Sequence, residues 1–366
     1  HKYKDKTDLY SKFLSAIKTE FDIDIDISEK ERFRCWFKRV RRSMDEQYAS
    51  QELKILELKE ERVKARDQRR ELNKIIREKA RFDYIQEFIK EAATQVAKEK
   101  PIVSNHHSPA LAGNKEGVAH IGDWHFGLEY KNMFGEFNPS ICRERVEIYT
   151  QKVIQYGLAN RIKCLYVVNT GDLISGNLHV TVRIANTEDI IKQTMSVAEV
   201  LAEMLSKFAE VFDEVIYCDV LDNHARVIQN KNDSIPKESF VRVIKWWLET
   251  RLSDITNIKF IDAYDDEIAV LNICSNIVFA VHGHRDSIKD VVSNLTLMTK
   301  QIPDYVFVGH LHHHFEDEIH GCEIIMTPSL CGTDDYAKGI RKTGKPGQKF
   351  HVFSEHGREI TYFINF

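Results

Sequence analysis

The sequence predicts an α/β protein with an all-α extension at its N-terminal end. Beyond residue 117, runs of β-forming residues alternate with segments of helical period, a pattern typical of helices packed on a sheet. Residues 50–99 contain neither proline nor glycine and are rich in good helix formers, which favours long helices. These patterns divide the chain into residues 1–48, 49–99, 100–116 and 117–366.

Residues 1–48 are predicted to form a basic helical module. Apolar residues from Leu9 to Phe21 recur at helical spacing, and Ser28 to Glu31 form a capping box that begins a second helix. One face of this second helix is expected to be buried, and it holds Phe33, Phe37, Val40 and Met44. The other face carries the candidate nucleic-acid-binding residues Arg32, Arg34, Lys38, Arg39, Arg41 and Arg42. A face that is only solvated is an equally good interpretation.

Residues 49–99 are predicted to form one long charged helix or a helical pair. The heptad pattern is too interrupted for a coiled coil. The segment is expected to lean on the next domain, or to form an antiparallel pair or a pair between subunits of a homo-oligomer. Residues 100–116, with Pro101 and Pro109, are predicted to be a linker.

The elements of residues 117–366 follow from hydrophobic pattern. Strands are predicted at Val118–Ile121, Leu165–Thr170, Val215–Val220, Lys259–Ile261, Ile268–Leu271, Ile277–Val281, Tyr305–Val308, Glu323–Met326 and Phe350–Phe353. Helices are predicted at Ile141–Tyr156, Thr187–Phe212 and Phe240–Leu252. Asp334 to Lys349 are predicted to be a loop whose cations either hold a polyanion or are simply solvated.

Five polar blocks each follow a predicted strand. They are Gly122-Asp123-Trp124-His125, Gly171-Asp172, Asn223-His224, His282-Gly283-His284 and Gly309-His310-Leu311-His312. Open α/β sheets bind ligands at the carboxyl ends of their strands, so these side chains are expected to converge. Carboxylate, amide and imidazole ligands suit Mn, Fe or Zn better than Ca. The sequence therefore predicts a site for two metal ions.

This order of blocks resembles the calcineurin-like metallophosphoesterase superfamily, whose motifs are D-x-H, G-D, G-N-H-D/E, an isolated histidine and G-H-x-H. The resemblance implies two packed mixed β-sheets flanked by helices. It also implies two divalent ions, with Mn²⁺ as the first choice and Fe, Zn or Mg as alternatives. The first ion would be bound by Asp123, His125 and His312, the second by Asn223, His282 and His310, and Asp172 would bridge them. His224 would be the acid that protonates the leaving oxygen.

The histidine-rich blocks leave some assignments open. His284 competes with His282 for one position, and the run from Leu311 to His314 does not fix which histidines point inward. Arg226 is a candidate for binding a phosphate oxygen, although a surface ion pair would explain it as well.

Three positions depart from the family pattern. Asp222 stands where a glycine usually precedes the Asn-His pair, and Ala225 stands where an acid usually follows it. His224 must therefore be oriented in another way. Ser175 occupies the place of a histidine that is common in SbcD-type DNA repair nucleases, and His179 is a candidate to replace that histidine or is an ordinary loop residue.

Charge and cysteine content limit the class of protein. Residues 1–100 carry 26 Lys and Arg against 21 Asp and Glu, and the rest of the chain carries 26 against 35. Seven cysteines, an odd number without a C-x-x-C pair, argue against a disulfide framework. No apolar run is long enough for a membrane span, and no signal-peptide pattern opens the chain. We expect a cytoplasmic enzyme that does not bind membranes.

The expected activity is hydrolysis of phosphodiester bonds, as a DNA exo- or endonuclease. The basic N-terminal module and the similarity to SbcD-type and phage-encoded members favour DNA. The alternative is a phosphoesterase acting on nucleotides or phosphoproteins, with N-terminal helices used for oligomerisation. A catalytically inactive scaffold is disfavoured, because all seven ligand positions have a candidate. An ATPase partner of the SbcC type has no recognisable docking surface in the sequence.

Overall fold

The computed structural model describes residues 6–22, 27–99, 114–178 and 184–366. The chain divides into two compact units, His1–Tyr84 and Ile85–Phe366. We call them the N-terminal unit and the C-terminal unit. Over the described ranges, no helix combines the length and the apolar character needed to cross a membrane.

The N-terminal unit contains helix α1 (Lys6–Phe21) and most of helix α2 (Ile27–Glu99). The ring of Phe13 in α1 lies 5.1 Å from that of Phe37 and 6.4 Å from that of Phe33, so the two helices pack through aromatic side chains. Helix α2 runs without interruption through residue 48, where the sequence pattern suggested a boundary.

The buried face predicted for the second helix is only partly correct. Phe33 and Phe37 are half-buried, but Val40 is 36% exposed and Met44 is 50% exposed. The ring contacts of Phe13 reach Phe33 and Phe37, on the early turns of α2, and no further. The prediction that Val40 and Met44 are buried is therefore wrong for the single chain.

The C-terminal unit is built on two sheets. The larger has the strand order β13-β12-β1-β4-β5-β6, and the smaller has the order β10-β11-β9-β8-β7. The larger sheet comprises β1 (Glu116–Ile121), β4 (Cys164–Asn169), β5 (Glu214–Asp219), β6 (Ile258–Phe260), β12 (Gly347–Ser354) and β13 (Gly357–Asn365). The smaller comprises β7 (Ile268–Ile273), β8 (Asn276–Val281), β9 (Tyr305–Val308), β10 (Phe315–Ile319) and β11 (Cys322–Met326).

Both sheets are mixed. In the larger sheet β1, β4, β5 and β6 are parallel, and in the smaller sheet β8, β9 and β11 are parallel; the outer neighbours pair antiparallel. A short hairpin of β2 (Tyr130–Asn132) and β3 (Gly135–Phe137) forms a third, two-stranded sheet. Parallel neighbours end at the same edge of a sheet, which places several strand-end loops together.

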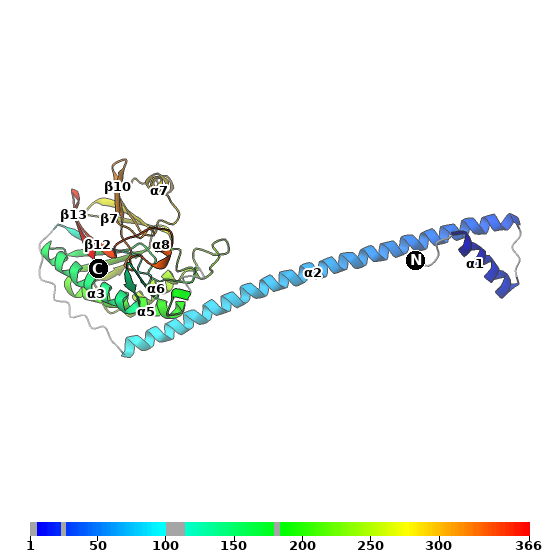
Figure 1. Ribbon diagram of the computed structural model, residues 1–366, viewed down its shortest axis with the longest axis horizontal. Coiled ribbons are helices and arrows are strands. Elements are labelled where there is room, and N and C mark those ends of the chain that lie inside the picture. The colour runs from blue at the N-terminus through cyan, green and yellow to red at the C-terminus, as the bar shows by residue number, and fades with distance from the viewer. Residues whose placement is uncertain (1–5, 23–26, 100–113, 179–183) are drawn as a thin grey trace. The chain divides into compact units, whose positions relative to one another are not determined.

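Helices cover the outer faces of the sheets. Helices α3 (Pro139–Ala159), α5 (Ile190–Val211) and α6 (Phe240–Arg251) lie together on one side of the unit, and α7 (Val291–Thr299) lies on the other, near β7 and β10 (Figure 1). Side-chain caps begin three of these helices, since Asn138, Asp189 and Ser239 each accept a backbone N–H of the first turn.

Alternation along the strands explains this layering. In β1, Ala119 and Ile121 face the core beneath the helices, whereas Val118 faces a second core shared with strands of the smaller sheet. A third core packs α7 on the outer face of the smaller sheet. The predicted fold class, two packed mixed sheets flanked by helices with an all-α N-terminal extension, is confirmed.

The loop predicted from Asp334 to Lys349 is wrong at its end. The segment contains the short helix α8 (Asp335–Gly339), and strand β12 already begins at Gly347. The Lys349 side chain is fully buried, and its Nζ donates to Glu316 Oε1 at 2.9 Å. Its charge is therefore compensated inside the protein and is not offered to a polyanion.

Candidate metal centre

The loops that follow β1, β4, β5, β8 and β9 bring the seven predicted ligands to one place. Five of them adopt left-handed backbone conformations, with φ values of 51° at Asp123, 49° at His125, 53° at Asp172, 70° at His310 and 59° at His312. Residues other than glycine rarely take positive φ, and such conformations concentrate at functional sites. In this chain they turn ligand-type side chains inward directly after a strand ends.

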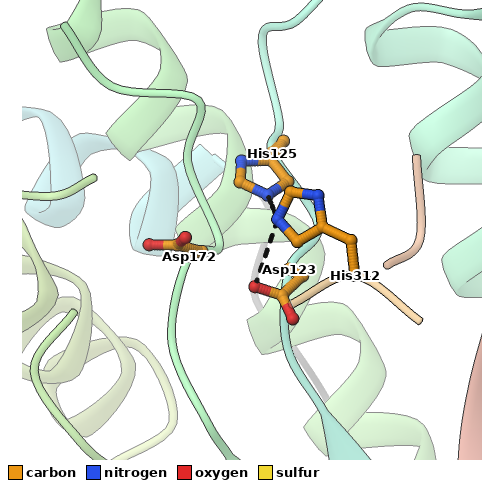
Figure 2. Close-up of side chains that lie close together, drawn as sticks. All are labelled: Asp123, His125, Asp172 and His312. Carbon is orange, nitrogen blue, oxygen red and sulfur yellow. Dashed lines mark hydrogen bonds and ion pairs between the residues drawn. The ribbon is translucent and has the colours of Figure 1, made fainter. Parts of the chain in front are cut away.

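Four of these side chains form the first cluster. Ligand atoms of Asp123, His125, Asp172 and His312 all lie within 4.8 Å of one another. Figure 2 shows the rings of His125 and His312 facing each other above the Asp123 carboxylate. The two Nε2 atoms are 2.9 Å apart, and His312 Nε2 lies 3.7 Å from Asp123 Oδ1. The arrangement presents two nitrogens and two carboxylates to a single point.

The second cluster shares Asp172 with the first. Ligand atoms of Asp172, His282 and His310 lie within 4.8 Å of one another. His282 Nε2 is 2.7 Å from Asn223 Oδ1 and 3.2 Å from His310 Nδ1, so the amide joins this group. The two clusters therefore meet at one carboxylate, as the sequence led us to expect for a bridging ligand.

The donor set fits divalent cations. Asp172 Oδ2 is buried and has no hydrogen-bond partner among the described residues, yet it lies 3.2 Å from His282 Nε2. A buried anionic oxygen without a partner is costly unless a cation compensates it. Two imidazole nitrogens at 2.9 Å likewise need a proton or a cation between them. Two ions sharing Asp172 would satisfy both requirements.

Burial keeps three of the histidines in the form that binds metals. It lowers the pKa of His312 to about 3, with Asp172 opposing, and lowers the pKa of His310 to about 4. The pKa of His125 is also well below its usual value, because of burial and then the nearby His312. Burial alone would lower the pKa of His282, but Asp172 outweighs it and raises that pKa to about 10. Neutral imidazole is the metal-binding form.

Hydrogen bonds to the backbone orient the ligands. His282 Nδ1 lies 2.8 Å from the carbonyl oxygen of Thr170, which turns Nε2 toward the cluster. The backbone N–H of His310 donates to both carboxylate oxygens of Asp123, at 2.9 and 3.1 Å. These contacts tie the ends of strands from the two sheets together across the site.

His224 lies beside the clusters and is oriented by an unusual partner. Its Nδ1 is 2.7 Å from the carbonyl oxygen of Ser175, and its Nε2 is 3.7 Å from Asp172 Oδ2. Nδ1–H therefore donates to the backbone and Nε2 faces the site. This carbonyl contacts His224 Nδ1, and Ala225 stands where the family pattern has an acid after the Asn-His pair. A backbone group leaves no signal in the sequence.

Asp222 connects two loops of the candidate site through contacts that the sequence did not reveal. Its buried carboxylate accepts the backbone N–H of Asp172 at 2.8 Å and that of Ala225 at 2.7 Å. It thus links the loop that carries the shared ligand to the loop that carries His224. The sequence did signal this position, because Asp222 stands where the family pattern has glycine. It gave no indication of which groups the side chain contacts.

Arg226 is half-buried close to the centre. Its Nε is buried and has no hydrogen-bond partner in the part of the chain that the structure describes. Burial, and then the charge of Arg285, lower its pKa, while Asp172 and Asp222 act in the opposite direction. The guanidinium is therefore within electrostatic range of the shared carboxylate. His179 lies outside the described residues.

The remaining histidines of the ambiguous blocks turn away. His284 is in neither cluster, and its Nε2 lies 4.0 Å from Glu267. His313 Nδ1 bonds to the carbonyl oxygen of Leu311, and the ring of His314 packs on Phe363. The geometry thus selects His282, His310 and His312.

The six cations predicted to bind nucleic acid lie on α2, in the N-terminal unit. All are solvent-exposed: Arg32, Arg34, Lys38, Arg39, Arg41 and Arg42. Arg34 and Arg42 make exposed ion pairs with Glu31 and Glu46, at 3.6 and 3.4 Å. Such pairs are weak, so they leave both cations accessible to a ligand.

Comparison with known proteins gives one sequence relative and several weak structural likenesses. The chain is 27% identical over 322 residues to the SPbeta prophage-derived uncharacterized protein YonJ of Bacillus subtilis (strain 168), covering 85% of this chain and 79% of that protein. No family model matches the chain.

Among solved structures, a novel archaeal phosphodiesterase is 14% identical, covering 68% of this chain and 99% of that one, with a TM-score of 0.34. Vps29 with zinc from Entamoeba histolytica is 12% identical, with coverages of 68% and 98% and a TM-score of 0.32. A predicted phosphoesterase from Streptococcus pneumoniae TIGR4 is 10% identical, with coverages of 70% and 100% and a TM-score of 0.26. At these scores the structural likenesses carry no argument, and the description of the fold rests on this chain's own strand order.

The resemblance to calcineurin-like metallophosphoesterases extends from the order of the motifs to the two-sheet fold and to the convergence of the motif residues at the strand ends. The site brings buried carboxylates and imidazoles together as ligands suited to divalent metal ions.

Proposed function

We propose that this chain hydrolyses phosphodiester bonds with two divalent metal ions and that its substrate is DNA. The observation that carries the hydrolytic part is the sharing of Asp172 by two ligand clusters, with His224 beside it. Paired cations joined by one carboxylate are suited to in-line displacement at phosphorus. Mn²⁺ is the metal we expect, with Fe, Zn or Mg as alternatives.

The protein's own groups then have separate tasks. The ligand set would hold the ions, Asp123, His125 and His312 on one side and Asn223, His282 and His310 on the other. Bound divalent ions lower the pKa of water into the neutral range and offset charge on the phosphate. His224 Nε2 protonates the leaving oxygen, since Nδ1 is held by Ser175. Arg226 binds a non-bridging oxygen through its unpartnered Nε–H.

Three considerations favour a DNA nuclease. The exposed cations of α2 offer a surface for a phosphate backbone. The curated relative is described as prophage-derived, which agrees with the similarity to phage-encoded members of the superfamily. The start of the second motif, Gly171-Asp172-Leu173, is like that of SbcD-type repair nucleases. Both exonuclease and endonuclease action fit this site, and an ATPase partner is compatible with it.

The alternative is a nucleotide or protein phosphoesterase whose N-terminal helices serve only to join subunits. One observation favours it, namely that α2 exposes large apolar side chains that a single chain leaves in contact with water. Leu53 is 62% exposed, Leu56 58% and Ile75 59%. Burial of such side chains against a second copy would be favourable.

A panel of substrates tests the proposal. With Mn²⁺ present, cleavage of end-labelled linear DNA, closed circular DNA and single strands is compared with hydrolysis of para-nitrophenyl phosphate and its bis ester. Cleavage of DNA by the wild type, lost in Asp172→Asn, supports a nuclease, and cutting of closed circles makes it an endonuclease. Turnover of small esters with no attack on any DNA selects the alternative.

A further inference from the structure

The segment from Ser329 to Pro346 is anchored to the metal centre at both ends. At its start, Ser329 Oγ and the backbone N–H of Leu330 each donate to the carbonyl oxygen of Asp123 at 3.0 Å. Near its end, Gly344 lies so close to His312 that a Cβ there would be 2.6 Å from the His312 carbonyl oxygen. Helix α8 and the turn after it are therefore held beside two candidate ligands.

Four cations project from this segment, and all are exposed: Lys338, Arg341, Lys342 and Lys345. None has a carboxylate within 4.0 Å among the described residues. The two acids of the segment are occupied, since Asp334 caps α8 through Ala337 N at 2.7 Å and Asp335 accepts from Asn132 Nδ2 at 3.2 Å. With four cations against these two carboxylates, the segment carries a formal charge of +2.

The patch lies beside the centre. Gly344, whose added Cβ would be 2.6 Å from the carbonyl oxygen of His312, also donates its N–H to Thr333 Oγ1 at 3.0 Å. Lys342 and Lys345 are within two residues of Gly344 in the chain. These two cations therefore lie close to the loop that carries His310 and His312.

The cations of this segment stand out against the negative charge of the chain around them. Residues beyond 100 carry 26 basic against 35 acidic side chains, so a polyanion is repelled by most of this unit and needs local cations to approach the metal centre. Tyr336 is 61% exposed and Ile340 is 49% exposed among the cations. Aromatic side chains interspersed with Lys and Arg are typical of surfaces that bind single-stranded nucleic acid.

We propose that residues 334–346 bind a nucleic-acid strand next to the scissile phosphate, with Arg341 and Lys342 contacting flanking phosphates and Tyr336 stacking on a base. This inference rests on the proposed function, and it assigns nucleic-acid strands as the substrate class of the metal centre. A short phosphodiester without flanking phosphates does not make these contacts.

A double variant and a matched control test it. Arg341→Gln with Lys342→Gln removes two charges from the segment. Arg161→Gln with Lys163→Gln removes two charges at the amino end of β4, the opposite end of the strands. The two arginines are matched in backbone conformation as well, because Arg341 and Arg161 both have φ of 58°. For each, kcat/KM is measured with Mn²⁺ on a single-stranded oligonucleotide and on bis(para-nitrophenyl) phosphate, from 50 to 200 mM salt.

We expect the ratio of kcat/KM on the oligonucleotide to that on the small diester to fall about tenfold in the segment variant, with the salt slope reduced by about 1 to 2. The control pair should keep the wild-type ratio and slope. If the segment variant behaves like the control on an oligonucleotide that the wild type cleaves, the inference is overturned and the nuclease proposal stands. If the wild type hydrolyses the small diester and cleaves no nucleic acid, both fall.

Discussion

Gly176 is the position where a single added methyl group should disturb the orientation of His224. Gly176 has φ of +68°, and a Cβ built there would lie 2.0 Å from the carbonyl oxygen of His224, whereas real Cβ contacts stay above 3.0 Å. Gly176→Ala therefore requires the two backbones to separate by about 1 Å, judged from the minimum separation of non-bonded atoms. The loop is held on both sides, because Gln193 Oε1 accepts the Gly176 N–H and Asn186 Nδ2 donates to its carbonyl.

These contacts allow the effects of Gly176→Ala on stability and on kcat to be estimated. The left-handed conformation costs alanine about 1 kcal/mol, and this cost appears in stability alone. The displacement acts on the bond from His224 Nδ1 to Ser175 O, now 2.7 Å, which would lengthen beyond hydrogen-bond range. A misplacement of about 1 Å in a catalytic group lowers the rate about 100-fold. Steady-state hydrolysis of bis(para-nitrophenyl) phosphate measures kcat, and urea unfolding measures the stability.

Gly321→Ala is the control. Gly321 has φ of +80° but no atom within 4 Å of its added Cβ, so it carries the same backbone strain without the collision. It should lose about 1 kcal/mol of stability and no activity. A kcat for Gly176→Ala within twofold of that for Gly321→Ala would refute the reasoning that this loop positions His224.

Three further predictions concern charge, metal and proton transfer. Burial raises the pKa of Asp219 to about 6, above the value of about 3.9 in an unfolded chain, so stability is lost as pH rises through this interval. Asp219→Asn should therefore raise the free energy of unfolding at pH 8 by up to about 3 kcal/mol and change it little at pH 4, and equal effects at both pH values in denaturant melts would contradict this. Mn²⁺ at about 100 times its Kd should stabilise the wild type by about 3 kcal/mol for each ion bound, and an unchanged Tm in thermal melts would argue against a preformed site. His224→Ala should lower kcat about 100-fold or more with metal content retained, whereas His313→Ala, whose ring turns away, should keep both.

The ligand positions were predictable because each lies in a short polar block that follows a run of β-formers. Asp123, Asp172 and His282 all follow buried strands, and parallel strands that end at one edge bring distant motifs together. What the sequence could not show is backbone conformation. The positive φ of Asp123 and Asp172 depends on hydrogen bonds from residues far along the chain.

The sequence also could not predict the environment of side chains whose partners lie far away in the chain. Lys349 reads as a loop cation, but its partner Glu316 lies on a strand of the other sheet, so its burial depends on how the sheets pack. Gln348 carries no pattern at all, although its amide bonds to both the N–H and the carbonyl of Gly122 and so fixes the turn before Asp123. Side-chain bonds across such sequence distances have no local signature.

For helix α2 the sequence left two structures open, one long helix or a pair of helices. Residues 50–99 have no glycine or proline to end a helix, yet the weak apolar pattern from Lys64 to Glu71 left a pair of helices open. The structure has one helix of 73 residues. Helix propensity and the lack of a breaking residue determine its continuity more than packing does, since most of its described side chains are exposed.

The most direct test of the central claim is the metal content of the wild type and Asp172→Asn, measured by elemental mass spectrometry together with hydrolysis of bis(para-nitrophenyl) phosphate. The account predicts two Mn²⁺ per wild-type chain, a reduced content in the variant, and a rate lower by about 1,000-fold or more, because both clusters share this carboxylate. Two ions retained in an Asp172→Asn variant that still turns over would contradict the assignment of Asp172 as the shared ligand.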